Sequence, residues 1–259
     1  MPPTNRHLAA LRAPQVSNRL GPSSIVILPL GAIEQHGPHL PFNTDEVIAR
    51  ATAEALVTRH GDDHDLWLLP TLPFTKSNEH AWSQGTMWLS ATTLLAVIDD
   101  IARCVAQMGA GKLVFLNGHG GNSALLGVAN RDVRLRHGLQ TFLAHPSVPA
   151  DQGGASPPSE LGMGIHGGTD ETSVMLHLAP ELVDMSVATR NVPDKLAGNR
   201  HVRFGGRVGF GWLSDDFGPD GHIGDPTLAT AELGAHLLDT AVSLLGEAMA
   251  EVSSFDFGR

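Results

Sequence analysis

The chain has 259 residues, of which 42% are apolar and 17% charged, and its formal net charge is −10 with a pI near 5.7. These proportions suit a compact core, and we expect a single domain over residues 1–259. Nucleic acid and anionic membranes both favour clustered Lys and Arg, so an acidic chain argues against either partner. We therefore predict a small-molecule substrate.

Cysteine usage and the chain start bear on the cellular compartment. The single cysteine, Cys104, excludes an internal disulfide, and its apolar context IARCVAQMG predicts a buried structural thiol. The start MPPTNRHLAALRAP lacks the apolar core of a signal peptide, and no stretch approaches the roughly 20 apolar residues of a membrane span. We expect a soluble, cytoplasmic protein.

Short apolar runs alternate with helix-like segments along the chain, in βα order. We expect strands at 24–30, 66–74, 112–118 and 139–145, and helices at 46–60, 92–109, 122–138, 171–183 and about 227–252. Composition predicts loops at 60–65 and 151–160. Strands that are apolar on both faces and joined by crossover helices predict a mostly parallel sheet covered on both sides.

Two loops after predicted strands carry unusual polar residues. GAIEQHGPHLPFNTDE (31–46) follows the first strand, and NGHGGN (117–122) places His119 between glycines after the third. Ligands of open parallel sheets gather beyond the carboxyl ends of the strands. We therefore expect the two loops to face one another.

The chemistry of these loops suits a divalent transition metal, because imidazole and carboxylate are ligands for zinc, manganese or iron. Glu34 and His36 are two residues apart, so they point the same way in an extended segment. A short carboxylate such as Asp45 can bridge two ions. The alternative is that Asp45 caps the helix predicted from Glu46 and that His36 is an ordinary turn histidine.

Two further clusters are expected at the same edge. GIHGGTDETSVML (164–176) places His166 before two glycines and puts Asp170 and Glu171 in the first turn of a helix, where acidic residues are also ordinary dipole partners. SNEHAWSQGT (77–86) adds Glu79 and His80 after the second predicted strand. All four clusters therefore place polar residues on loops at one end of the sheet.

Two rival interpretations arise from glycine-rich segments. Gly162, Gly164 and Gly167 spell G-x-G-x-x-G, which would fit a dinucleotide-binding oxidoreductase, but the motif follows a Pro-rich loop rather than a strand. The basic stretch GNRHVRFGGRVGFGW (198–212) would fit an acidic partner. The net charge argues against that partner, so we interpret the stretch as a mobile lid or a subunit contact.

Five motifs follow one another along nearly the whole chain: E-Q-H-G-P-H-L-P with Asp45, S-N-E-H with G-T at 85–86, N-G-H-G-G-N, H-G-G-x-x-E-T-S, and G-D-P-T at 224–227. Together they resemble the creatininase family of metal-dependent amidohydrolases. The resemblance implies a three-layer α/β/α sandwich with a mostly parallel central sheet, usually a homohexamer, and two divalent metal ions per subunit (zinc, manganese or iron). Carried over by position, Glu34 and His119 hold one ion and His36 the other, with Asp45 bridging.

One departure from the family pattern affects the expected substrate. Creatininase itself has Tyr then Glu after the histidine of the third motif, where this chain has Gly120 and Gly121. The resemblance then implies that Glu171, or its neighbour Asp170, supplies the missing carboxylate and that creatinine is not the substrate. We predict hydrolysis, by metal-bound hydroxide, of a non-peptide C–N bond in a small, possibly cyclic, amide or formamide. A peptidase of the mycofactocin-maturation type is the alternative.

The leaving nitrogen of such a reaction needs a proton. His166 is predicted as the general acid, because imidazole titrates near the working pH and the flanking glycines allow close approach to substrate. Glu79 and His80 are the next candidates, with orientation of substrate or metal ligands as their other expected role.

Overall fold

The computed structural model describes residues 5–146 and 157–257. Its four strands form one parallel sheet in the order β2-β1-β3-β4. The strands are β1 (Ile25–Leu30), β2 (Leu66–Leu68), β3 (Lys112–Asn117) and β4 (Gln140–Ala144). The helices are α1 (Ala13–Arg19), α2 (Thr44–His64), α3 (Ala91–Gln107), α4 (Ser123–His137), α5 (Thr169–Leu178), α6 (Asp194–Ala197) and α7 (Ala231–Ser254).

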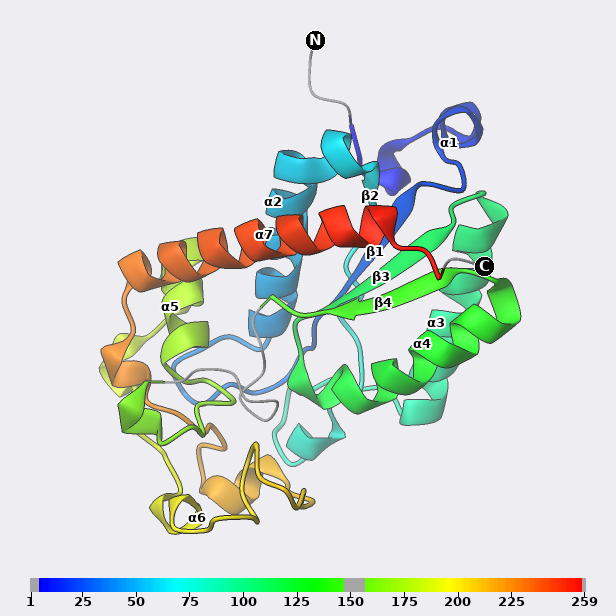
Figure 1. Cartoon of the computed structure of the whole chain (residues 1–259). Coiled ribbons are helices and arrows are strands. Elements are labelled where there is room, and N and C mark those ends of the chain that lie inside the picture. The colour runs from blue at the N-terminus through cyan, green and yellow to red at the C-terminus, as the bar shows by residue number, and fades with distance from the viewer. Residues whose placement is uncertain (1–4, 147–156, 258–259) are drawn as a thin grey trace.

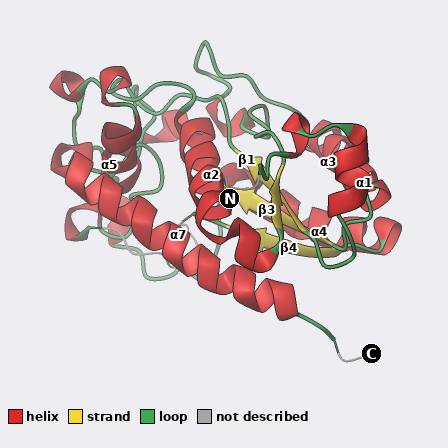
Figure 2. Cartoon of the chain, turned by 90° about the horizontal axis from the view of Figure 1, so that it is seen from above, coloured by secondary structure: helices red, strands yellow, loops and turns green. Residues whose placement is uncertain are grey.

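The sheet lies between two helical layers, as Figures 1 and 2 show, with α3 and α4 on one face and α2 and α7 on the other. Strand alternation explains this burial: Val26 and Leu28 of β1 pack with Leu94 of α3, whereas Ile25 and Ile27 point to the opposite face. There they join a cluster that includes Leu56 of α2 and Leu245 of α7. The α/β/α sandwich with a mostly parallel sheet is therefore confirmed.

The strand order creates a switch point between β1 and β3. From β1 the chain passes through α2 to β2 on one side, and then through α3 to β3 on the other side of β1. Loops leaving the carboxyl ends of β1 and β3 diverge there, and a crevice between such loops is the usual ligand site of an open α/β sheet. The two loops singled out from the sequence leave the sheet at this point.

Some predicted boundaries were wrong. The strand predicted at 66–74 pairs as β2 only over Leu66–Leu68, because Pro70 and Pro73 lack the N–H that a ladder requires. The segment 60–65 is not a loop: α2 continues to His64 and ends at Asp65, whose φ of 51° is left-handed. Arg6 binds Asp62 and Asp65 there.

Two other predicted helices and the predicted thiol environment also need correction. Helix α5 starts at Thr169 and ends at Leu178, because Pro180 begins a separate 3₁₀ turn. Helix α7 starts at Ala231, where the Thr230 side chain accepts from the N–H of Leu233. Cys104 is exposed, since the buried face of α3 consists of Leu94, Ile98, Ala102 and Val105.

Two remaining predictions concern a loop and membrane spans. Of the loop predicted at 151–160, residues 151–156 lie outside the described residues, and Pro158–Glu160 form a 3₁₀ turn. Among the helices that the structure describes, none combines the length and apolar character needed to cross a membrane.

Candidate metal centre

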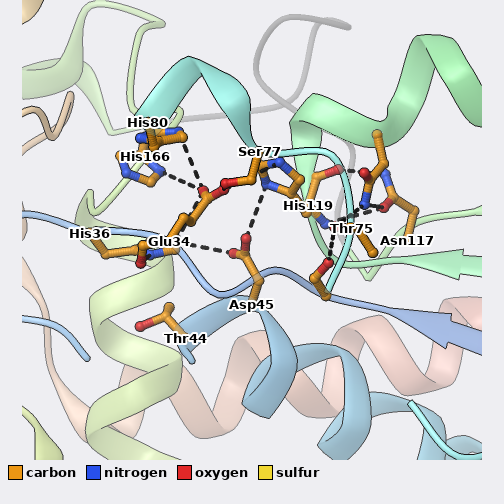
Figure 3. Close-up of polar contacts among 12 residues, drawn as sticks. Glu34, His36, Thr44, Asp45, Thr75, Ser77, His80, Asn117, His119 and His166 are labelled. Carbon is orange, nitrogen blue, oxygen red and sulfur yellow. Dashed lines mark hydrogen bonds and ion pairs between the residues drawn. The ribbon is translucent and has the colours of Figure 1, made fainter. Parts of the chain in front are cut away.

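The loop after β1 brings Glu34, His36 and Asp45 together in the interior (Figure 3). The loop packs tightly against the start of α2, because a Cβ on Gly31 would overlap the backbone of Glu46. Asp45 lies in the first turn of α2 but is not its N-cap, which is Asn43. The capping alternative for Asp45 is therefore wrong, and its carboxylate is directed at histidines instead.

His36 presents one ring nitrogen to this cluster. Its Nδ1 lies 3.1 Å from the carbonyl oxygen of Glu34, which can only accept, so Nδ1 carries the proton. Its Nε2 lies within hydrogen-bond distance of Oδ1 of Asp45, at 3.1 Å, and 3.9 Å from Oε1 of Glu34, so this is the nitrogen that a metal ion would take over from a proton. A backbone carbonyl that fixes the ring in this way is typical of metal-binding histidines.

His119 enters from the loop after β3 with the same type of arrangement. Its Nε2 lies 2.9 Å from the carbonyl oxygen of Lys76, which fixes the proton on Nε2. Its Nδ1 then faces Oδ2 of Asp45 at 3.0 Å. That oxygen has no partner with hydrogen-bond geometry, so the contact leaves a lone pair and a carboxylate oxygen side by side. Such a pair is stabilised by a positive charge, which is a proton on His119 when no metal is bound and would be a metal ion in the loaded site.

The start of α5 contributes His166 and Glu171. Gly167, at a left-handed φ of 64°, turns the chain so that its N–H donates to Oε2 of Glu171 at 2.6 Å. Glu171 lies with His36 and Asp45 in one group of potential ligands, whereas Asp170 lines the adjoining cavity and belongs to no such group among the described residues. The structure thus favours Glu171 over Asp170 as the carboxylate at this position.

The cluster contains three groups of potential ligand atoms. Within each group, the atoms lie within 4.8 Å of one another. Two groups share Asp45 and divide the other residues as the family resemblance implies: Glu34 with His119, and His36 with Glu171. The third consists of Glu34, His36 and His166. Oε1 of Glu34 and Oδ2 of Asp45 are buried without hydrogen-bond partners, a costly state that bound cations would relieve. The donor set therefore fits divalent metal ions.

The pKa values show the electrostatic cost of this crowding. Burial raises the pKa of Glu34 to about 8 and that of Glu171 to about 7. Burial opposes the charge on His36 as well, but neighbouring carboxylates, with Asp45 first, together raise its pKa to about 10. Without metal the cluster therefore holds protons on groups that would otherwise be ligands, and metal binding would displace them.

Glu79 and His80 lie beside the cluster on a 3₁₀ turn, Asn78–His80. Oε1 of Glu79 lies 3.5 Å from Nε2 of His119, and its other oxygen binds Lys76. His80 is buried, and burial, followed by repulsion from His119, lowers its pKa to about 3. Burial, followed by repulsion from His36, likewise places the pKa of His166 well below its usual value.

The two glycines that depart from the creatininase pattern differ in their surroundings. A Cβ on Gly120 would meet nothing within 4 Å, so this position opens into the cavity. A Cβ on Gly121 would overlap Oε1 of Glu79 and crowd the ring of His119. Glu79 therefore fills the space into which a side chain at position 121 would project.

A cavity of about 640 Å³ opens above the cluster. Aromatic side chains of the 198–212 segment, Phe204, Phe210 and Trp212, form one wall, and Leu237 and Leu244 of α7 form another. The segment interpreted as a lid thus borders the site, while its movement stays a prediction. The dinucleotide alternative finds no support, because the carboxylate of Glu160 fills the space beside Gly164 and Gly168.

Sequence reasoning assigned no role to several residues at the site. Ser77 donates to Oε2 of Glu34 at 2.5 Å, and Gln35 contacts both His80 and His166. Both residues lie inside the family motifs, Gln35 in E-Q-H-G-P-H-L-P and Ser77 in S-N-E-H, and this position in a motif was the sequence signal that could have identified them. Lys76 and His145 also line the cavity, and no sequence pattern marked them. His39 of the first loop is directed away, toward Gly167 and Thr172.

A parallel α/β sheet with buried histidines and carboxylates at its carboxyl edge is typical of metallohydrolases. Comparison with known protein families identifies the family within this class. The family model for creatinine amidohydrolase matches residues 9–249, and the chain belongs to the creatininase family of amidohydrolases.

Individual relatives agree with this assignment. The chain is 36% identical over 236 residues to the mycofactocin precursor peptide peptidase of Mycobacterium ulcerans (strain Agy99), covering 84% of this chain and 83% of the relative. It is 34% identical over 186 residues to the creatinine amidohydrolase of Pseudomonas putida, covering 65% and 70%. A manganese creatininase structure gives a TM-score of 0.73 at 26% identity, covering 96% of this chain and 98% of that one.

Proposed function

We propose that this chain is a metal-dependent hydrolase that cleaves an amide C–N bond at one end of a short peptide or a peptide-like amide. The observation that carries the proposal is the buried group of Glu34, Asp45 and His119 on the floor of a cavity of about 640 Å³. Cavities for drug-sized ligands measure about 300–1,000 Å³, so this one has room for much more than a single small ring.

Two ions per chain are part of the proposal. Glu34 and His119 would hold one ion and His36 and Glu171 the other, with Asp45 shared, as the two groups of ligand atoms support. When bound, such ions lower the pKa of water and polarise a carbonyl group. The chain itself supplies the walls of the cavity. It also supplies the residue that protonates the leaving nitrogen, for which the candidates are His166, Glu79 and His80.

The preference for a peptide changes the expectation drawn from sequence, which placed a small amide or formamide first. It is supported by the size of the cavity, by the open space beside Gly120, and by the similarity to peptidases that act on the mycofactocin precursor. A small cyclic amide stays the second candidate, because the Pseudomonas putida relative is a creatinine amidohydrolase. The resemblance also implies a homohexamer, which light scattering would test.

The experiment is a substrate screen with protein purified without chelator and supplied with zinc or manganese. Creatinine, formamides and a library of short peptides are each incubated with the protein, and products are identified by mass spectrometry. We expect cleavage of peptides and negligible turnover of creatinine. Asp45→Ala protein from a parallel purification controls for contaminating peptidases. Rapid creatinine turnover with intact peptides would overturn the proposal in favour of the second candidate.

A further inference from the structure

Gln35 lies between two of the candidate catalytic histidines, and the backbone fixes the orientation of its side-chain amide. Oε1 accepts from the N–H of Gly37 at 2.8 Å, and Nε2 donates to the carbonyl oxygen of Gly221 at 3.0 Å. Exchanging oxygen and nitrogen would break both hydrogen bonds. The amide nitrogen of Gln35 is therefore a donor with one further proton to give.

That second proton determines the tautomer of His80. Nδ1 of His80 lies 2.9 Å from Nε2 of Gln35, and because the amide nitrogen only donates, Nδ1 must accept. The ring proton is then on Nε2, which lies 3.4 Å from Oε1 of Glu34. Oε1 has no hydrogen-bond partner, so Glu34 does not take up this N–H. His80 also lines the cavity.

His166 has the same tautomer but faces the cluster with its other nitrogen. Its Nε2 lies 2.6 Å from the backbone carbonyl oxygen of Gln35, which only accepts, so Nε2 carries the proton. Nδ1 is then a lone pair, 3.6 Å from Oε1 of Glu34. The contact at 3.2 Å between Nε2 of His166 and Nε2 of Gln35 joins two donors, since Gly221 and His80 take both amide protons.

We propose that His80 is a catalytic hydrogen-bond donor to the carbonyl oxygen of the scissile amide, and that Gln35 is the positioning residue that keeps its proton on Nε2. His166 presents a lone pair to the same space and so acts as a proton acceptor or a ligand. A neutral imidazole N–H in a closed cavity stabilises negative charge that develops on a carbonyl oxygen. The proposal rests on the amide-hydrolase function above and removes His80 from the candidate general acids. The leaving nitrogen is then protonated by Glu79, or by Nδ1 of His166 after that atom has accepted a proton.

The direct test reads the tautomers by NMR and needs no substrate. Zinc-loaded protein with ¹⁵N-labelled histidine is observed through two-bond ¹H–¹⁵N correlations, and the missing signals of His80→Gln and His166→Asn assign the two rings. We expect a proton on Nε2 of both. In Gln35→Glu, whose carboxylate only accepts, the His80 proton should move to Nδ1 while His166 is unchanged. Gln107→Glu, the same exchange at an exposed position, should alter neither ring.

The second test uses a substrate found in the screen. His80→Leu should lower kcat by about 10²–10³, the usual cost of losing one oxyanion donor, with little change in KM. His80→Gln, whose amide N–H can replace Nε2–H, should retain more of the rate. A proton on Nδ1 of His80 in the wild type, or equal rates for the two variants, would overturn the proposal. Failure of the screen would affect only the proposed function, because the NMR result stands without it.

Discussion

Polar groups are buried at both ends of the same sheet, but the charged groups among them differ in their partners. At the amino end, Asp65 accepts from Arg6, Trp67 and Ser24 at 2.6–2.8 Å. Nearby, Lys112 donates to the last carbonyls of α7. The buried Ser24 and Lys112 therefore have hydrogen-bond partners within the chain, while the Asp65 side chain is 36% exposed.

At the carboxyl end of the sheet, two buried carboxylates lack part of their hydrogen bonding. One oxygen of Glu34 and one of Asp45 are buried without a hydrogen bond, although histidines surround both. An unsatisfied buried carboxylate costs stability unless something outside the chain completes it. The difference indicates that the polar groups at the amino end stabilise the fold, whereas those at the carboxyl end form a group of potential metal ligands.

The largest expected effect comes from removing the shared carboxylate. Asp45→Ala should lose most of both ions, with the affinity for metal reduced by more than about 10²-fold, because even indirect partners of a ligand are worth 10–100-fold. Elemental analysis of the purified variant measures this. Stoichiometric zinc retained in Asp45→Ala would contradict the shared role.

Loss of a ligand that serves one ion should have a smaller effect. Glu171→Gln keeps the shape of the side chain but weakens its binding, so we expect close to one ion per chain, held by Glu34, Asp45 and His119. A calorimetric titration of the metal-free variant with zinc should resolve one strong site and one weakened site. Two undisturbed sites would remove Glu171 from the ligand set.

A matched pair of glycine variants tests the surroundings of His119. Gly121→Ala must displace Glu79 or His119 and should weaken metal binding by about 10–100-fold. Gly120→Ala, which meets open space, should bind metal as the wild type does. Equal affinities for the two variants would show that the contact between Gly121 and Glu79 has no effect on the site.

The smallest effect on the metal is expected at the amino end. Asp65→Ala leaves the Ser24 hydroxyl and the Trp67 N–H without their acceptor and should lower the free energy of unfolding by about 1–3 kcal/mol. Its metal content should equal that of the wild type. Urea unfolding and elemental analysis of the same preparation check both statements, and metal loss in this variant would mean that the two ends are coupled.

Much of the fold could be read from the sequence, because its runs of apolar residues match the strands and its helical periods match α2, α3 and α4. The errors have local causes. Pro70 and Pro73 shorten β2, and α2 continues through Gly61 until the left-handed Asp65 ends it. The exposure of Cys104 was readable from the spacing of the apolar residues on α3, since it falls between Ala102 and Val105 on another face.

The convergence of the candidate residues was predictable from the sequence, but the arrangement of their atoms was not. The loops after β1 and β3 indicated Glu34, His36, Asp45 and His119, because the carboxyl ends of parallel strands lie at the same edge of the sheet. The sequence carried no sign that Glu79 fills the space beside Gly121, or which nitrogen of each histidine is protonated. Those properties depend on backbone carbonyls and on Gln35, which become neighbours only in the folded chain.

The most direct test of the central claim is a crystal structure of zinc-soaked protein with anomalous scattering recorded at the zinc edge. We predict two peaks at coordinating distance, about 2.0–2.2 Å, from the carboxylate of Asp45. One peak should be shared with Glu34 and His119 and the other with His36 and Glu171. A map with no peak beside Asp45, or with zinc only at exposed histidines, would contradict the conclusion that the carboxyl end of the sheet is built to hold metal.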